Sequence, residues 1–216
     1  MEIGIIGLPN SGKTTIFNAL TRSQTATQAF SSGQLEVHTA VVDVPDPRVD
    51  RLTEMFKPKR TIYAQVTYND IAGLGKGAGK SGISGPLLNA IAANEAVMLV
   101  VRAFTDEGVP HPEDSVDAAR DLLIMETELI LNDMTTIDRR LERIAGMKNR
   151  GTPEERKRMA EEEVLLQRLM AELEQERPLR DMEISEEERR RLGGFGLLSL
   201  KPLLRVVNAG DDDDEA

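Results

Sequence analysis

Apolar and polar positions follow two different periods along the chain. Short apolar or β-branched runs of strand length occupy residues 3–6, 35–44, 61–68 and 96–101. Segments of helical spacing lie between them, at residues 15–20, 49–56 and 86–94. Strands that alternate with helices in this way predict an α/β fold with a mostly parallel sheet.

From residue 115 onward the pattern becomes helical over a long distance. Thr152, Pro153 and Glu155 supply an N-cap, a first-turn proline and a capping-box glutamate, so a second helix is expected after a break at 149–151. The predicted apolar stripe consists of Leu122, Met125, Leu129, Ile137, Leu141, Ile144 and Met147, and then of Met159, Val164, Leu166, Leu169, Met170 and Leu173. Two long helices joined by a short polar turn predict an antiparallel coiled-coil hairpin.

This helical segment interrupts the α/β pattern. Pro178 ends it, Ser185 begins a third short helix, and residues 203–207 are expected to form one more core strand. We therefore predict an α/β domain at residues 1–113 and 197–216, with a helical insertion at 114–196.

The most informative stretch is 7–14, with the sequence GLPNSGKT, between the first predicted strand and the first predicted helix. Two glycines with four residues between them let backbone amides turn toward a phosphate, and the helix N-terminus adds its positive dipole end. We expect Lys13 to reach the β- and γ-phosphates and Thr14 to bind Mg²⁺. The remaining predicted nucleotide contacts in this loop are Asn10, Ser11, Gly12 and Thr15. A chance glycine-rich turn is the alternative, which the order of strand, loop, Lys-Thr pair and helix disfavours.

A second motif, DIAG at residues 70–73, follows the third predicted strand. Asp70 is expected to hold Mg²⁺, usually through water, and the Gly73 amide to sense the γ-phosphate. Alone, such residues are typical of an ordinary strand-end turn, but their position after the phosphate loop favours the metal motif. The glycine-rich segment 74–85 suits a nucleotide-sensing switch, with a surface linker as the alternative, and the polar segment 23–33 suits a first switch.

Composition narrows the classes of protein. The chain is 40% hydrophobic, 30% charged and only 3% aromatic, without tryptophan, so much of it is expected to be charged helix. Because there is no cysteine, disulfides and thiolate metal sites are excluded. No apolar run approaches the roughly 20 residues of a membrane span, and Met1 leads directly into a strand, so no membrane partner and a cytoplasmic location are expected.

The formal net charge of −10 argues against a general nucleic-acid-binding surface. Local basic faces remain at 57–60 and at Arg139, Arg140 and Arg143. A solvated helix face is the simpler expectation for each of them.

The motifs at 7–20, 44–48, 70–78, 115–121, 127–131 and 201–208 together resemble the YchF-type ATPases, a branch of the Obg-like group of translation-factor-related P-loop proteins. The resemblance extends over nearly the whole chain. It implies a Ras-like P-loop NTPase domain, a coiled-coil insertion and ribosome-linked ATP hydrolysis. It also implies a further C-terminal TGS-type domain, so on this resemblance the present sequence is expected to be a fragment or a shortened form.

The base-reading motif is altered. In most GTPases an Asn-Lys-x-Asp motif reads guanine, but here Asn208 is followed by Ala209, so the stacking lysine is missing. The family that the chain resembles carries a similarly altered motif and favours ATP over GTP. Asp211 could restore a guanine contact or simply begin an acidic tail. ATP is therefore the expected nucleotide, with GTP as the alternative.

Hydrolysis is expected to be slow. Leu74 occupies the position where many GTPases carry the glutamine that orients the attacking water, and leucine cannot form that hydrogen bond. The resemblance suggests His111 as the catalytic residue instead, although a single loop histidine is more often an ordinary surface residue. The family's first switch usually contains Phe-Cys-Thr, which is missing here, and this leaves Ser31, Ser32 or Thr39 to contact Mg²⁺.

Two hypotheses of different classes follow. The first is a Mg²⁺-dependent nucleotide hydrolase that acts as a slow, ribosome-linked switch, in which Lys13 and the loop amides stabilise the transferring phosphoryl group. The second is a nucleotide-binding scaffold with negligible turnover, which Leu74 and the altered first switch favour.

Overall fold

The computed structural model describes residues 1–23, 25, 37–71, 84–147 and 151–210. The chain divides into two compact units, one made of residues 1–75, 94–116 and 203–216 and the other of residues 76–93 and 117–202. The predicted domain boundaries at 113/114 and 196/197 stay a prediction, and each unit is described by itself.

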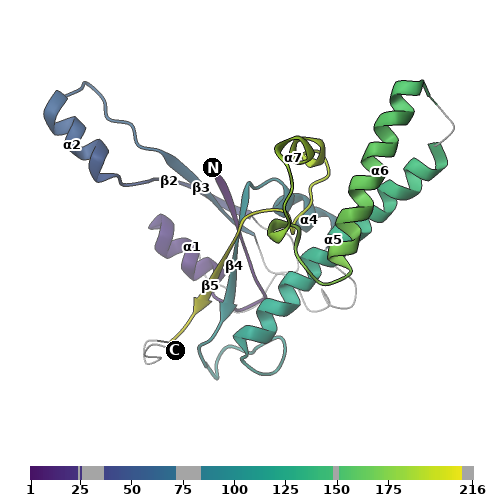
Figure 1. Cartoon of the computed structure of the whole chain (residues 1–216). Helices are drawn as coiled ribbons and strands as arrows, with labels where there is room; N and C mark the ends of the chain where they lie inside the picture. Colours follow the sequence, from purple (N-terminus) through teal and green to yellow (C-terminus); the bar gives the residue numbers. More distant parts are fainter. Residues whose placement is uncertain (24, 26–36, 72–83, 148–150, 211–216) are drawn as a thin grey trace. The chain divides into compact units, whose positions relative to one another are not determined.

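The first unit contains a five-stranded mixed sheet in the order β2-β3-β1-β4-β5 (Figure 1). Its strands are β1 (Glu2–Ile6), β2 (Val37–Asp43), β3 (Gln65–Ile71), β4 (Ala96–Arg102) and β5 (Leu203–Asn208). Only β2 runs antiparallel to its neighbour, β3, and the other pairings are parallel. The prediction of an α/β fold with a mostly parallel sheet is therefore confirmed.

The core of this sheet lies along β1 and β4, whose inner residues are apolar. Ile5 of β1 and residues 97–101 of β4 are almost completely buried, as expected for parallel strands covered on both faces. Helix α1 (Lys13–Thr21) follows β1 and buries Phe17 against Ile5, Met98 and Val100.

Strand β5 differs from its expected role. We predicted a core strand, but β5 pairs only with β4, and Leu204 and Val207 are 55% and 59% exposed. An apolar sequence is compatible with burial, but it does not determine where a strand lies in the sheet. β5 is exposed because it is the last strand in the order and forms an edge of the sheet.

Helix α2 (Pro47–Phe56) lies between β2 and β3 in the chain and buries no residue. It begins at Asp46, whose carboxylate accepts a hydrogen bond from the Arg48 amide at 2.9 Å. Its apolar residues Leu52, Met55 and Phe56 are 54–73% exposed.

The second unit is helical. It contains α4 (Gly85–Ala92), α5 (Ala118–Met147), α6 (Pro153–Leu173), the short 3₁₀ helix η1 (Leu179–Asp181) and α7 (Glu186–Leu192). Helices α5 and α6 pack side by side (Figure 1). The expected capping box begins α6, with the Thr152 amide donating to Glu155 at 2.7 Å and the Glu155 amide donating to Thr152 Oγ1 at 3.3 Å. Coiled-coil geometry for this pair stays a prediction.

The helical core follows most of the predicted stripe, with two departures, one of which is Met147 at the end of α5, 39% exposed. Leu166, Leu169 and Leu173 are buried as expected, but Val164 is 67% exposed and Leu165 is buried in its place. Val164 precedes Leu169 by five residues, which places it about 140° around the helix, whereas Leu165 lies one turn before Leu169. The helical period therefore selects Leu165.

Asp133 of α5 ties the segment after α7 to this core. Its buried carboxylate accepts hydrogen bonds from the amides of Leu198 and Ser199 at 2.8 and 2.7 Å and from Ser199 Oγ at 2.7 Å. Burial raises the pKa of Asp133, and these hydrogen bonds oppose the rise.

Among the helices that the structure describes, none combines the length and apolar character needed to cross a membrane.

Candidate nucleotide site

The phosphate loop connects β1 to α1, and its two glycines occupy positions where a side chain does not fit. Gly12 has φ 90°, and a Cβ atom there would lie 2.1 Å from Nδ2 of Asn208. A Cβ atom on Gly7 would lie 2.3 Å from the carbonyl oxygen of Val100. Other parts of the sheet therefore pack directly against the loop backbone, and both positions require glycine.

Lys13, the first residue of α1, is buried in the loop, with only 7% of its surface exposed. Its Nζ donates a hydrogen bond to the Leu8 carbonyl at 2.8 Å. Burial lowers the pKa of Lys13 to about 8, and the nearby Asp70 carboxylate partly opposes this fall. A buried ammonium of this kind is strongly favoured by a bound anion such as phosphate.

Thr14 and Asp70 come together although they lie on different elements. The Thr14 hydroxyl donates to Oδ2 of Asp70 at 2.7 Å, and Asp70 is 2% exposed near the end of β3. The register places Asp70 opposite Ile5, so the parallel pairing of β1 and β3 delivers the carboxylate to the loop.

The oxygen donors at this point fit a magnesium ion. Within the described part of the chain, Asp70 Oδ1 and Ser11 Oγ are the buried side-chain polar atoms without a hydrogen-bond partner. Hydroxyl and carboxylate oxygens are the ligands that Mg²⁺ prefers. The described residues contain no group of three or more His, Asp or Glu side chains placed to hold a metal, so phosphate and water would complete the coordination.

Asn208, at the end of β5, lies beside the phosphate loop. The side-chain amide of Asn208 donates a hydrogen bond to the Ser11 carbonyl at 3.1 Å. The backbone carbonyl of Asn208 accepts a hydrogen bond from the Ala103 amide at 2.8 Å. Strand pairing thus brings the predicted base-reading residue to a loop almost 200 positions earlier in the sequence. Asp211 and Gly73, also predicted to contact nucleotide, lie outside the described residues.

His111 lies in the loop after β4 and is half-buried. Its Nδ1 accepts a hydrogen bond from the Glu113 amide at 3.1 Å, so the neutral ring carries its hydrogen on Nε2. The preceding carbonyl, of Pro110, accepts from Nδ2 of Asn10 at 2.9 Å. A direct hydrogen bond therefore joins the phosphate loop to the loop that carries His111.

Arg102 is a residue of this site that sequence reasoning missed. It ends β4, is 2% exposed, and donates to the carbonyls of Phe104, Val109 and Asp106 at 3.0, 3.0 and 3.3 Å. Its guanidinium also stacks on Phe104, 4.3 Å from the ring centre. The available signal was an arginine directly after an otherwise apolar strand, since a buried arginine must find partners.

The other predicted residues are separated from this cluster or undescribed. Thr15 is exposed near the start of α1. Thr39 pairs with Asn69 across β2 and β3, and its hydroxyl donates to that side chain at 2.6 Å. Because adjacent strand residues point to opposite faces, Thr39 lies on the face opposite Asp70 and is a poor Mg²⁺ ligand in this conformation. Ser31, Ser32 and Leu74 lie outside the described residues.

Three features define a P-loop NTPase domain: a glycine-bounded loop after the first strand, a buried lysine, and a threonine paired with an aspartate near the carboxyl ends of the parallel strands β1 and β3. Residues 2–144 also match the sequence model of a family described as "50S ribosome-binding GTPase".

Individual relatives make the assignment more specific. The "Ribosome-binding ATPase YchF" of Bacillus subtilis (strain 168) is 35% identical over 214 residues, covering 99% of this chain and 57% of the relative. The "Obg-like ATPase 1" of Schizosaccharomyces pombe is 36% identical over 217 residues, covering 99% and 55%. A solved structure of the S. pombe YchF GTPase superposes with a TM-score of 0.79 at 35% identity, covering 99% of this chain and 57% of the other. The chain belongs to the YchF/Obg-like ATPase family, and it spans little more than half the length of these relatives.

Proposed function

We propose that this chain binds ATP together with Mg²⁺, accepts GTP less well, and hydrolyses the bound nucleotide slowly as a ribosome-linked switch in the cytoplasm. The observation that carries the proposal is the convergence of buried Lys13 with the Thr14–Asp70 pair at the phosphate loop. The ribosome link is supported by relatives that are named ribosome-binding ATPases.

In this mechanism the protein supplies charge and position. Lys13 and the loop amides stabilise negative charge on the transferring phosphoryl group. Thr14 and Asp70 would hold Mg²⁺, which neutralises phosphate charge when bound. Preference for ATP is supported by Ala209, because no lysine side chain follows Asn208 to stack on guanine.

His111 is proposed to orient the attacking water rather than to remove its proton. Because Nδ1 already accepts the Glu113 amide, the neutral ring presents an N–H donor at Nε2. A donor can position water or stabilise a phosphate oxygen, but it is not a general base.

A titration in which ATP and GTP compete for the Mg²⁺-bound protein tests the nucleotide assignment, and tighter GTP binding would contradict it. Hydrolysis by Lys13→Ala tests the enzyme assignment, with Lys59→Ala as a matched control at an exposed lysine. Undiminished ATP hydrolysis by Lys13→Ala would refute the proposed role of the loop.

The alternative is a nucleotide-binding scaffold with negligible turnover. It is favoured by Leu74 and by the position of Thr39 on the opposite face of the sheet. Single-turnover ATP hydrolysis with and without ribosomes separates the two: acceleration by ribosomes supports the switch, and its absence supports the scaffold.

A further inference from the structure

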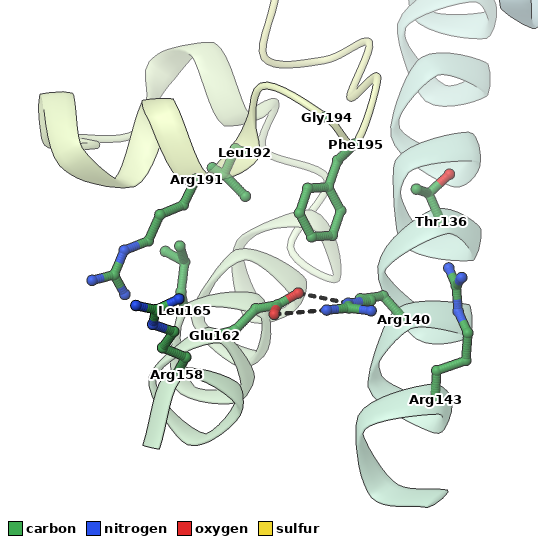
Figure 2. Close-up of a pocket in the computed structure, with 10 residues that line it drawn as sticks. All are labelled: Thr136, Arg140, Arg143, Arg158, Glu162, Leu165, Arg191, Leu192, Gly194 and Phe195. Atoms are coloured by element: carbon green, nitrogen blue, oxygen red, sulfur yellow. Dashed lines mark hydrogen bonds and ion pairs between the residues drawn. The ribbon is translucent and has the colours of Figure 1, made fainter. Parts of the chain in front are cut away.

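A pocket of about 590 Å³ lies entirely within the helical unit, between α5, α6 and the segment around α7 (Figure 2). Its lining is Thr136, Arg140, Arg143, Arg158, Glu162, Leu165, Arg191, Leu192, Gly194 and Phe195. Four arginines and one glutamate therefore line a single concave site, although the whole chain has a formal charge of −10. Such a local excess of guanidinium groups indicates an anionic ligand.

Two of the arginines are already neutralised. Arg140 forms a two-pronged ion pair with Glu162, at 2.6 and 2.8 Å (Figure 2). Arg191 binds the carboxylates of Glu187 and Glu161 at 2.7 and 3.1 Å. These pairs hold the walls of the pocket in place and leave the charge of the other two arginines available.

Arg143 and Arg158 are the available charges. In the regions that the structure describes, neither side chain forms an ion pair. Arg143 donates a hydrogen bond through Nε to the Arg139 carbonyl. The positive charge of Arg158 helps to lower the pKa of Glu155, but this is the smallest of the effects on that carboxyl group. Both side chains are exposed, so neither is needed to fill the helical core.

Part of the pocket lining is apolar and carries an aromatic ring. Leu165 and Leu192 are buried, and Phe195 is half-buried and packs against the same core. Figure 2 shows the Phe195 ring directed into the pocket, toward the Glu162–Arg140 pair. The pocket therefore combines an apolar aromatic surface with two guanidinium groups that form no ion pair with any residue that the structure describes.

We propose that this pocket binds a phosphorylated nucleoside, with the phosphate at Arg143 or at Arg158, which lie on opposite sides of the Arg140–Glu162 pair (Figure 2), and the base against Phe195. Guanidinium groups match phosphate oxygens in geometry and charge, and aromatic rings stack on bases of any sequence. The volume lies in the usual range of roughly 300–1,000 Å³ for small-ligand sites. The nucleoside phosphate can come from a free nucleotide or from a unit of single-stranded RNA, and the proposal is independent of the phosphate loop.

The test is fluorescence anisotropy with a labelled eight-nucleotide single-stranded RNA at fixed, near-physiological salt. The double variant Arg143→Ala/Arg158→Ala is compared with Arg139→Ala/Arg156→Ala, which removes the same charge from exposed positions of the same two helices outside the pocket lining. We expect the first variant to bind at least about tenfold more weakly, because it loses charged contacts to phosphate, and the second to change less than about threefold. An equal loss in both variants, or in neither, would overturn the proposal.

A third variant changes affinity in the opposite direction. Glu162→Gln removes the carboxylate that occupies Arg140, so RNA binding should become several-fold tighter. Loss of the folded pocket would weaken specific binding, so the expected gain has the opposite sign, and unchanged or weaker binding would contradict the assigned site.

Competition by unlabelled AMP distinguishes a free nucleotide from a unit of single-stranded RNA as the ligand of the pocket. Displacement of the RNA by AMP supports a mononucleotide site, whereas displacement only by unlabelled RNA supports a strand. Displacement by an eight-residue glutamate peptide at equal concentration would overturn the proposal in favour of a general anion site. RNA binding that is unchanged in Lys13→Ala supports a site separate from the phosphate loop, and loss of binding in that variant refutes it.

Discussion

Replacement of Lys13 by methionine should stabilise the ligand-free protein while it abolishes nucleotide binding. The fall of the Lys13 pKa from 10.5 to about 8 means that the folded state disfavours the ammonium at pH 7 by about 3 kcal/mol. Methionine removes that charge at similar length. It also removes the hydrogen bond to the Leu8 carbonyl, worth about 1 kcal/mol, but that oxygen still accepts the Ser11 amide. The expected net gain is therefore about 1–2 kcal/mol.

The gain should depend on pH with a defined sign. Between about pH 8 and 10.5 the unfolded chain keeps the Lys13 proton and the folded protein loses it, so the stability of the wild type rises with pH. The advantage of Lys13→Met should be full below pH 8 and should shrink as the pH approaches 10. Urea unfolding at pH 7 and 9.5 measures it, with Lys59→Met as the control at an exposed lysine.

Nucleotide binding should reverse the shift in the Lys13 pKa. Phosphate charge favours the ammonium, so binding at pH 8 should take up about half a proton per nucleotide, because half of the free protein is then deprotonated. Calorimetric titration in two buffers of different ionisation enthalpy counts these protons. No proton uptake at pH 8, together with no stability gain in Lys13→Met at pH 7, would refute the assignment of a desolvated ammonium to this loop.

Three further predictions concern single contacts. Gly12→Ala places a Cβ atom 2.1 Å from Asn208 Nδ2 and should lower nucleotide affinity at least about tenfold by calorimetry. Arg102→Lys replaces three hydrogen bonds to carbonyl oxygens and one ring contact by a single ammonium, which loosens the loop that carries His111. The kcat for ATP should therefore fall about tenfold with little change in KM. Adding His111→Ala to that variant should cause no further loss. Asp133→Ala leaves two buried amides unpaired and should cost about 2–4 kcal/mol in urea unfolding.

Each of these changes has a matched control. Gly146→Ala adds a methyl group where no atom lies within 4 Å, and it should leave nucleotide affinity unchanged. Arg51→Lys and Asp138→Ala alter exposed positions and should leave kcat and unfolding within error. If Arg102→Lys and His111→Ala lowered kcat additively, the two residues would act independently. A loss below about 1 kcal/mol in Asp133→Ala would show that the amides find water instead.

Local pattern was sufficient for much of the fold. The phosphate loop at 7–14, the start of α6 at the Thr152 capping box and the parallel core strands were all predictable, because each depends on residues close in sequence or on a simple period. The same reasoning misplaced Val164 in the core and β5 in the interior of the sheet. The first error was one of helical period, since Val164 lies about 140° around α6 from Leu169. The second arose because burial depends on the neighbouring element as well as on the polarity of the residue itself.

The sequence by itself determined which residues could hold a phosphate: Gly12 and Lys13 act through backbone conformation and charge within one turn of chain. Only the tertiary structure decided which distant residues complete the site. Strand pairing brings Asp70 to Thr14 and Asn208 to Ser11, and buried Arg102 holds the loop that carries His111. Such contacts arise from sheet order and register, which no local period encodes.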